Sequence, residues 1–180
     1  MKKTILIAIL LLSQTIAAQK YFTRTGSTNF KASVEAFEAV EATNNSTSVV
    51  LKTDSGDIAA LLLIKAFRFK VALMQEHFNE NYMDSDKHPK ATFRGKIDGF
   101  NLSEIDTKKE YSIKGTLTVR DVKKEIETVG TFSKSGNALN LNAVFSVTPQ
   151  DFDIEIPSIV RKKIAKSINI TLNYELVEKK

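Results

Sequence analysis

The chain has 180 residues, no cysteine and a formal net charge of +5 at pH 7. Without cysteine it has no disulfide, no thiol nucleophile and no lipid-modified N-terminus of the bacterial lipoprotein kind. Its lysines alternate with acidic residues and form no basic patch with interleaved aromatic residues, which argues against a nucleic-acid-binding protein. Its mild basicity would support only a weak, transient contact with an anionic membrane surface.

Residues 1–18 have the composition of a secretory signal peptide. A lysine pair after Met1 precedes an apolar run over residues 4–12, and small residues up to Ala18 supply a cleavage site. The apolar run is short for a membrane span, so we expect cleavage near Ala18; the alternative is a retained N-terminal anchor. The expected mature chain, residues 19–180, is one soluble domain that is periplasmic or secreted.

The first mature segments predict β-strands. The stretch "KYFTRTGSTNFKASVE" predicts one broken strand or two short strands around Gly26. Residues 54–57, Asp-Ser-Gly-Asp, predict a turn between a strand ending at Lys52 and the apolar stretch "DIAALLLIKAFRF".

Residues 71–83 break this alternation. Val71, Met74, Phe78 and Tyr82 recur at helical spacing, which predicts a short helix with one apolar stripe. Such a helix can lie across the open end of a barrel as a lid or plug.

The same stretch is dense in ionisable groups, so a chemical role is the alternative. His77 with Glu80 or Asp84 would supply a base and an orienting acid, but this spacing on a helix is common by chance. Asp84 and Asp86 lie among asparagines, yet the glycine and glutamate of a calcium loop are absent at the required spacing. His77 and His88 have no zinc-site spacing. We therefore expect no catalytic residue, no metal site and no cofactor.

The C-terminal half alternates with a period of two in residues 110–120, 138–147 and 167–178. Turns at residues 121–124 and 135–137 are hairpin connections on either side of a further strand, which is expected to run from near Glu125 to near Ser133. Ile156, Val160 and Ile164, with Pro157 in the first turn, predict a second short helix.

The fold class predicted from these elements is all-β, with eight or nine antiparallel strands and two short helices. One apolar sheet face is buried either against a second sheet or by closure into a barrel. Small inward residues, Gly115, Thr128, Gly130 and Ala143, would leave room for a ligand in a closed barrel. They are also compatible with a filled core in which they accommodate large neighbours.

The candidate ligand-binding residues are the inward members of the alternating strands and the apolar stripe of the helix. The predicted wall is Phe93, Ile97, Ile113, Leu117, Leu141, Phe145, Ile170 and Leu172. The predicted lid or head-group contacts are Met74, His77, Phe78, Tyr82 and Arg94.

Three blocks follow one another along the chain: "FRFKVALMQEHFNENYMDSDKHPKATFRGKI", "YSIKGTLTVRDVKKEI", and "DFDIEIP" with "VRKKIAKSINITLNYEL". As an ordered set they resemble the YceI-like family, in which glycine usually stands where this chain has Asp121. The resemblance covers roughly residues 56 to 177. The family's usual Asp-x-x-His-Ser opening is not matched by "YFTRTGSTNFKASVEAFEAV", so ligand contacts from that opening are not carried over.

The resemblance implies a lipocalin-like antiparallel barrel that is exported and holds an isoprenoid-type or other amphiphilic lipid in its central pore. We therefore predict a non-enzymatic protein that carries or sequesters a long apolar molecule. The alternatives are a structural or partner-binding barrel with a filled core, and a hydrolase or isomerase acting on a bound lipid. Monomer and homodimer both remain open.

Overall fold

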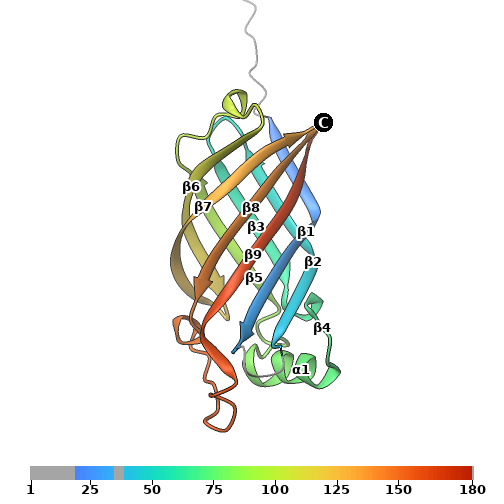
Figure 1. Ribbon diagram of the computed structural model, residues 1–180, viewed down its shortest axis with the longest axis vertical. Helices are drawn as coiled ribbons and strands as arrows, with labels where there is room; N and C mark the ends of the chain where they lie inside the picture. Colours follow the sequence, from blue (N-terminus) through green and yellow to red (C-terminus); the bar gives the residue numbers. More distant parts are fainter. Residues whose placement is uncertain (1–18, 35–38, 180) are drawn as a thin grey trace, which may run out of the picture.

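In the computed structural model, one antiparallel sheet closes on itself as a barrel (Figure 1). The structure describes residues 19–34 and 39–179; the predicted signal peptide lies outside them, and its cleavage stays a prediction. The strands within this part of the chain are β1 (Lys20–Ser33), β2 (Glu41–Lys52), β3 (Asp57–Leu63), β4 (Arg68–Phe69), β5 (Lys90–Ile97), β6 (Lys108–Val119), β7 (Val122–Ser135), β8 (Ala138–Val147) and β9 (Ile164–Glu178).

Eight of these strands form the barrel wall, and each pairs with its neighbour along the chain, except that β3 pairs directly with β5. The wall closes because β1 pairs with both β2 and β9. The two-residue β4 adds to the end of β2, where Ala42 faces Phe69. The predicted all-β barrel of eight or nine antiparallel strands is therefore confirmed. The alternative architecture, a sheet packed on a second sheet, is wrong.

The β6–β7 turn is tighter than predicted. It consists of Arg120 and Asp121 alone, with φ angles of 49° and 64°, and β7 begins at Val122 instead of Glu125. Two positive φ angles at the centre of a two-residue hairpin are typical of a type I′ turn. Aspartate tolerates a left-handed backbone, so Asp121 suits the second position of this turn.

β1 is one continuous strand, where the sequence predicted a broken strand or two short ones. Its pairing with β2 shifts register on both sides of Gly26, so the break is a pair of bulges. A Cβ atom at Gly26 would lie 2.6 Å from the ring of Tyr174, which is too close. Glycine at this position therefore lets the bulged strand pass over the tyrosine ring.

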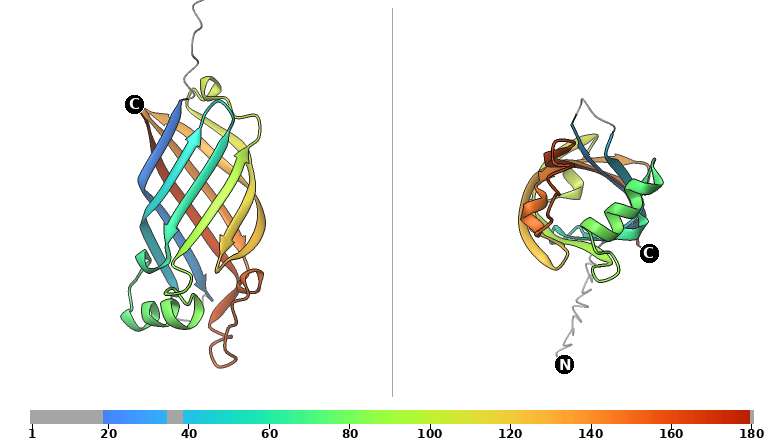
Figure 2. Two further views of the ribbon diagram at one scale, coloured as in Figure 1. Left: turned by 180° about the vertical axis from the view of Figure 1, so that it is seen from behind. Right: turned by 90° about the horizontal axis from the view of Figure 1, so that it is seen from below.

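The predicted helix over residues 71–83 is present as α1 (Ala72–His77), continued by the π-helical turn η2 (Phe78–Tyr82). These elements lie over part of one end of the barrel (Figure 2). No helix within residues 19–34 and 39–179 is long and apolar enough to cross a membrane.

The predicted second helix near residue 160 is wrong. Residues 158–163 form consecutive turns, in which Val160 and Arg161 both donate their backbone N–H to the Pro157 carbonyl. A helix this short depends on packing along one face. Here the loop projects beyond the end of the barrel (Figure 1), and Ile156, Val160 and Ile164 line an open cavity, so they have no packed surface to hold a helix against.

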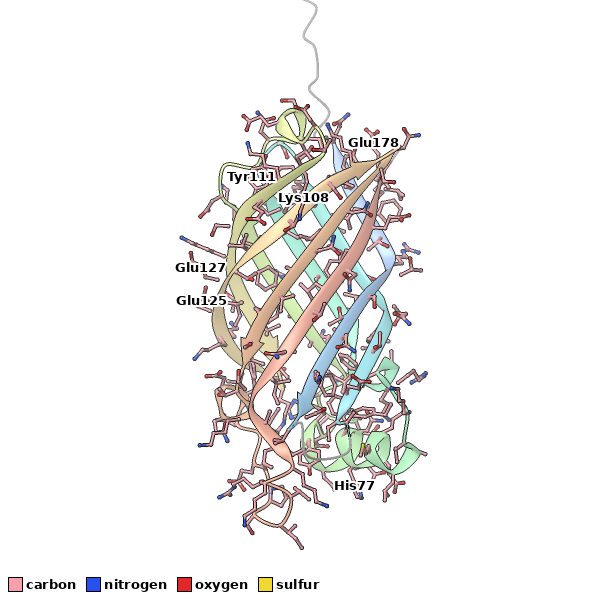
Figure 3. The ribbon with its side chains drawn as sticks, in the orientation of Figure 1. His77, Lys108, Tyr111, Glu125, Glu127 and Glu178 are labelled. Carbon is pink, nitrogen blue, oxygen red and sulfur yellow. The ribbon has the colours of Figure 1, made fainter. Side chains whose placement is uncertain are left out.

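The end of the barrel opposite α1 is closed by its own connections. Residues 98–107, with the short helix η3 (Leu102–Glu104), fold over it, and Ile105 is fully buried there. Phe100, Tyr111 and Phe132 pack against one another at centroid distances of 5.3 to 5.7 Å. We call this the closed end, and we call the end carrying α1 the open end. Figure 3 shows Tyr111 and His77 at these opposite ends.

Candidate functional site

On β6, β8 and β9, inward side chains become more exposed from the closed end to the open end. On β8, Leu139 and Leu141 are each 1% exposed, whereas Phe145 and Val147 are half-buried. The same change occurs along β6 and β9. Because these half-buried side chains point into the barrel, the surface they expose faces an internal space. The barrel is thus packed solid in one half and hollow in the other.

The hollow half holds a cavity of about 510 Å³. That volume lies within the usual range of small-molecule sites. Its wall is formed mostly by aliphatic and aromatic side chains, and among the described residues no carboxylate lines it. His77 of α1 and Lys163, which lies just before β9, both line the cavity, and both side chains are exposed. The cavity therefore reaches the surface near these two residues.

An aromatic cluster fixes the lid on one side of this opening. Phe78 of η2 packs against Phe30, Phe67 and Phe69, with ring centroids 5.1 to 5.7 Å apart. On the rim beneath it, Ile64, Met83 and Ala91 form a small buried cluster. The lid is therefore held by apolar contacts with β1 and with the chain around β4.

The short helix η4 (Pro149–Phe152) stands on the opposite side of the opening. Its N-cap, Thr148, accepts a hydrogen bond from the Asp151 backbone N–H, and the Asp151 carboxylate accepts one from the Thr148 N–H. Lys124 of β7 donates to the same carboxylate at 2.7 Å. The Lys124 hydrogen bond, followed by that from Thr148, lowers the pKa of Asp151 from 3.8 to about 2. Pro149 and Phe152 line the cavity on this side.

Three hydroxyl groups form the main polar feature within the cavity wall. Thr28 Oγ1 lies 2.8 Å from both Thr47 Oγ1 and the Tyr174 hydroxyl. All three side chains are buried, and burial raises the pKa of Tyr174 to about 12. The tyrosine is therefore neutral at physiological pH and acts as a hydrogen-bonding group.

Most of the predicted wall does line the cavity. This group comprises Phe93, Ile113, Leu117, Leu141, Phe145, Ile170 and Leu172. Ile97 does not belong to it: the side chain is 1% exposed and lies in the packed core of the closed end. Period-two alternation identified the inward face of β5, but it could not tell which residues of that face border the cavity and which lie in the packed core. Contact of these residues with a ligand stays a prediction.

Met74, His77, Phe78 and Tyr82, predicted for the lid, line the cavity near its opening. Arg94 lies elsewhere: it is exposed and does not line the cavity. It follows the inward residue Phe93 on β5, so its side chain points out of the barrel. Arg94 therefore lies outside the cavity, and its contact with a head group stays a prediction.

The alternative chemical roles of the lid find no assembled site among the described residues. Asp84 pairs with Lys87 at 2.7 Å and Asp86 with Lys65 at 2.5 Å. No cluster of three or more histidine, aspartate or glutamate side chains suited to a metal occurs within residues 19–34 and 39–179.

The sequence-based site omitted many cavity residues, including the following two sets. One is the hydroxyl trio, whose members Thr28 and Tyr174 are 146 residues apart. The other is an apolar set from β1, from the residue before β2 and from the chain after β8, namely Phe30, Ala32, Val40, Phe152, Ile154, Ile156 and Val160. The alternation of Thr28, Phe30 and Ala32 was the signal that could have identified the inward face of the first strand.

Solved structures with this architecture include barrels of the same kind. A polyisoprenoid-binding domain from Saccharophagus degradans, implicated in plant cell wall breakdown, has a TM-score of 0.77 at 12% identity over 89% of this chain and 98% of that one. Burkholderia cenocepacia BcnA gives 0.69 at 16% identity, covering 84% and 96%. A Campylobacter jejuni YceI protein gives 0.65 at 16% identity, covering 80% and 88%. At these identities the likeness shows a shared fold.

No curated protein matches the chain. The model of the YceI-like domain matches residues 14–176, which include the barrel from β1 into β9. The chain therefore belongs to the YceI-like family.

Proposed function

We propose that this protein is an exported, non-enzymatic barrel that holds an isoprenoid-like or other long apolar molecule in its cavity, for carriage or sequestration. The observation that carries the proposal is a cavity of about 510 Å³ with an almost wholly apolar wall, open at one end and packed at the other. The name of the Saccharophagus degradans domain as polyisoprenoid-binding supports the same ligand class.

The chemistry of the wall suits binding better than turnover. Burial of apolar ligand surface contributes about 25 cal/mol per Å², so a long chain can bind with few polar contacts. A reaction would need groups that are placed to move protons or to attack a bond, and no carboxylate lines the cavity within the described residues. A polar head group would stay near His77 and Lys163 at the opening, while the chain enters the barrel.

The test is native mass spectrometry of protein purified from its host's exported fraction, followed by lipid extraction. We expect a polypeptide that begins at Gln19 and carries a bound lipid mass. Protein that is ligand-free after mild purification and takes up no long-chain lipid would contradict the proposal. Chemical conversion of the bound lipid that stops in His77→Ala would instead identify an enzyme.

A variant with its cavity filled provides the specific control. Ile170→Trp places a large side chain in the cavity, and we expect the bound lipid to fall at least tenfold relative to the unmodified protein, because the indole occupies ligand volume. Val144→Trp is the matched control, since Val144 is 61% exposed on the outer face of the neighbouring strand. Equal lipid content in the two variants would place the ligand outside the barrel.

A further inference from the structure

The loop beside the open end combines an exposed apolar tip with a cluster of cations. Ile159 is 86% exposed, the highest value among the large apolar side chains of the described residues. Arg161, Lys162, Lys163 and Lys166 follow it within seven residues, and all four are exposed. No acidic residue occurs between residues 156 and 174.

This segment also belongs to the cavity. Ile156, Val160 and Ile164 line the wall near the opening, and Lys163 lies at the surface there. One side of the loop therefore faces the cavity while Ile159 points into solvent. In Figure 1 the loop projects beyond the end of the barrel, past the level of α1. A flat surface that approaches the open end would meet this loop first.

We propose that residues 157–166 dock the open end of the barrel onto a bilayer containing anionic phospholipids. Ile159 would enter the interface between head groups and acyl chains, and the cations would lie among the phosphates. Docking in this way places the cavity opening against the lipid from which cargo would be drawn. That last step rests on the proposed function, whereas docking itself does not require a cargo.

Charge complementarity selects an anionic bilayer over an apolar protein partner. Glu76 and Glu80 of the lid and Asp153 and Glu155 at the base of the loop are exposed acids, so the whole end is not uniformly basic. The positive charge is concentrated at the projecting part, next to the apolar tip. An isolated apolar side chain within a cationic loop offers little area to a protein groove, but it suits the shallow boundary of a membrane.

The test is co-sedimentation of the purified protein with vesicles of phosphatidylcholine alone or with phosphatidylglycerol added. Lys162→Gln/Lys166→Gln keeps the Arg161 hydrogen bond to the Ile156 carbonyl and leaves Lys163 at the cavity. We expect it to weaken binding to anionic vesicles about 25-fold, since each charge near the surface contributes about fivefold. Ile159→Ser should weaken binding about tenfold.

Matched controls carry the same changes far from the open end. Lys108→Gln/Lys134→Gln removes two exposed lysines from the region of the closed end, where Figure 3 shows Lys108. Val129→Ser removes an apolar side chain that is 56% exposed on β7, in the packed half of the barrel. We expect both to bind vesicles like the unmodified protein. Equal losses in control and loop variants, or equal binding to vesicles with and without phosphatidylglycerol, would overturn the proposal.

Uptake of a long-chain lipid from detergent micelles separates docking from the cavity function. We expect this uptake to be unchanged in all four variants, because none of the substituted residues lines the cavity. Loop variants that lose vesicle binding and micellar uptake together would show damage to the cavity, and this result would overturn docking. If the protein binds anionic vesicles as expected but takes up no lipid from micelles, the proposed lipid carriage is overturned and membrane docking stands.

Discussion

At the scale of single residues, the hydroxyl trio shows how polar atoms are accommodated in an apolar barrel. Thr28, Thr47 and Tyr174 satisfy one another, although they come from β1, β2 and β9. A buried hydroxyl without a partner is costly, so the three strands are held in one register at this level. The trio lies where the packed half meets the cavity and links the closure of the barrel to the shape of its hollow half.

Tyr174→Phe removes the hydroxyl and keeps the ring against Gly26. We expect it to lower the free energy of unfolding by about 1–2 kcal/mol, because Thr28 keeps only Thr47 as a partner. Urea denaturation followed by circular dichroism measures this. Tyr111→Phe serves as the comparison variant. It removes a tyrosine hydroxyl at the closed end that donates to the Asn101 backbone carbonyl at 3.0 Å and does not belong to the trio. An unchanged midpoint for Tyr174→Phe would mean that the hydroxyl contributes no net stability.

At the scale of elements, short connections around the open end are fastened to the barrel by a few charged contacts. In the β6–β7 turn, Arg120 donates to the Asp153 carbonyl at 2.6 Å, and Asp121 lies 2.8 Å from Nδ1 of His88. Lys124 holds Asp151 of η4. These contacts tie the lid side and the η4 side of the opening to the same hairpin.

The lowered pKa of Asp151 makes one of these contacts sensitive to acid. A carboxyl whose pKa falls from 3.8 to about 2 on folding stabilises the folded state above pH 3.8, and this contribution is lost as the pH falls through about 2. We expect Asp151→Asn to be less stable than the unmodified protein at pH 6, with the difference shrinking between about pH 4 and 2. Thermal unfolding across this range measures the effect.

Asp153→Asn is the control for that experiment, because Asp153 is exposed and its backbone carbonyl, not its carboxylate, accepts the Arg120 hydrogen bond. Asparagine also tolerates the left-handed backbone found there, with a φ of 54°. A stability difference for Asp151→Asn that stayed constant down to pH 2 would contradict the assignment of the acid-sensitive contact.

The strands were predictable from the sequence because a period of two reports one buried face directly, as in Tyr111, Ile113 and Leu117 of β6. The conformation of the loop near residue 160 was not predictable in this way. Ile156, Val160 and Ile164 have helical spacing, yet they line a cavity from a chain of turns. The position of Ile97 in the packed half was also unpredictable. Alternation identifies inward residues, whereas folded connections decide what fills the space in front of them.

At the scale of the whole molecule, the barrel is a tube with one packed half and one opening. Its affinity for a linear apolar chain should therefore depend on length. We expect the dissociation constant for a series of long-chain alcohols to fall about fourfold per added methylene, since each contributes about 0.8 kcal/mol. The gain should stop once the cavity is full. Titration calorimetry measures it, and an affinity independent of chain length would contradict insertion into the tube.

The start of β1 and the end of β9 both lie at the closed end. Tyr21 of β1 pairs with Glu178 of β9, and Figure 3 shows Glu178 at the pole opposite His77. A reporter or affinity handle attached after β9 would thus sit at the far pole from the opening. Copies immobilised through that handle on a sensor chip would all present the cavity to the solution flowing over them, without steric interference from the support.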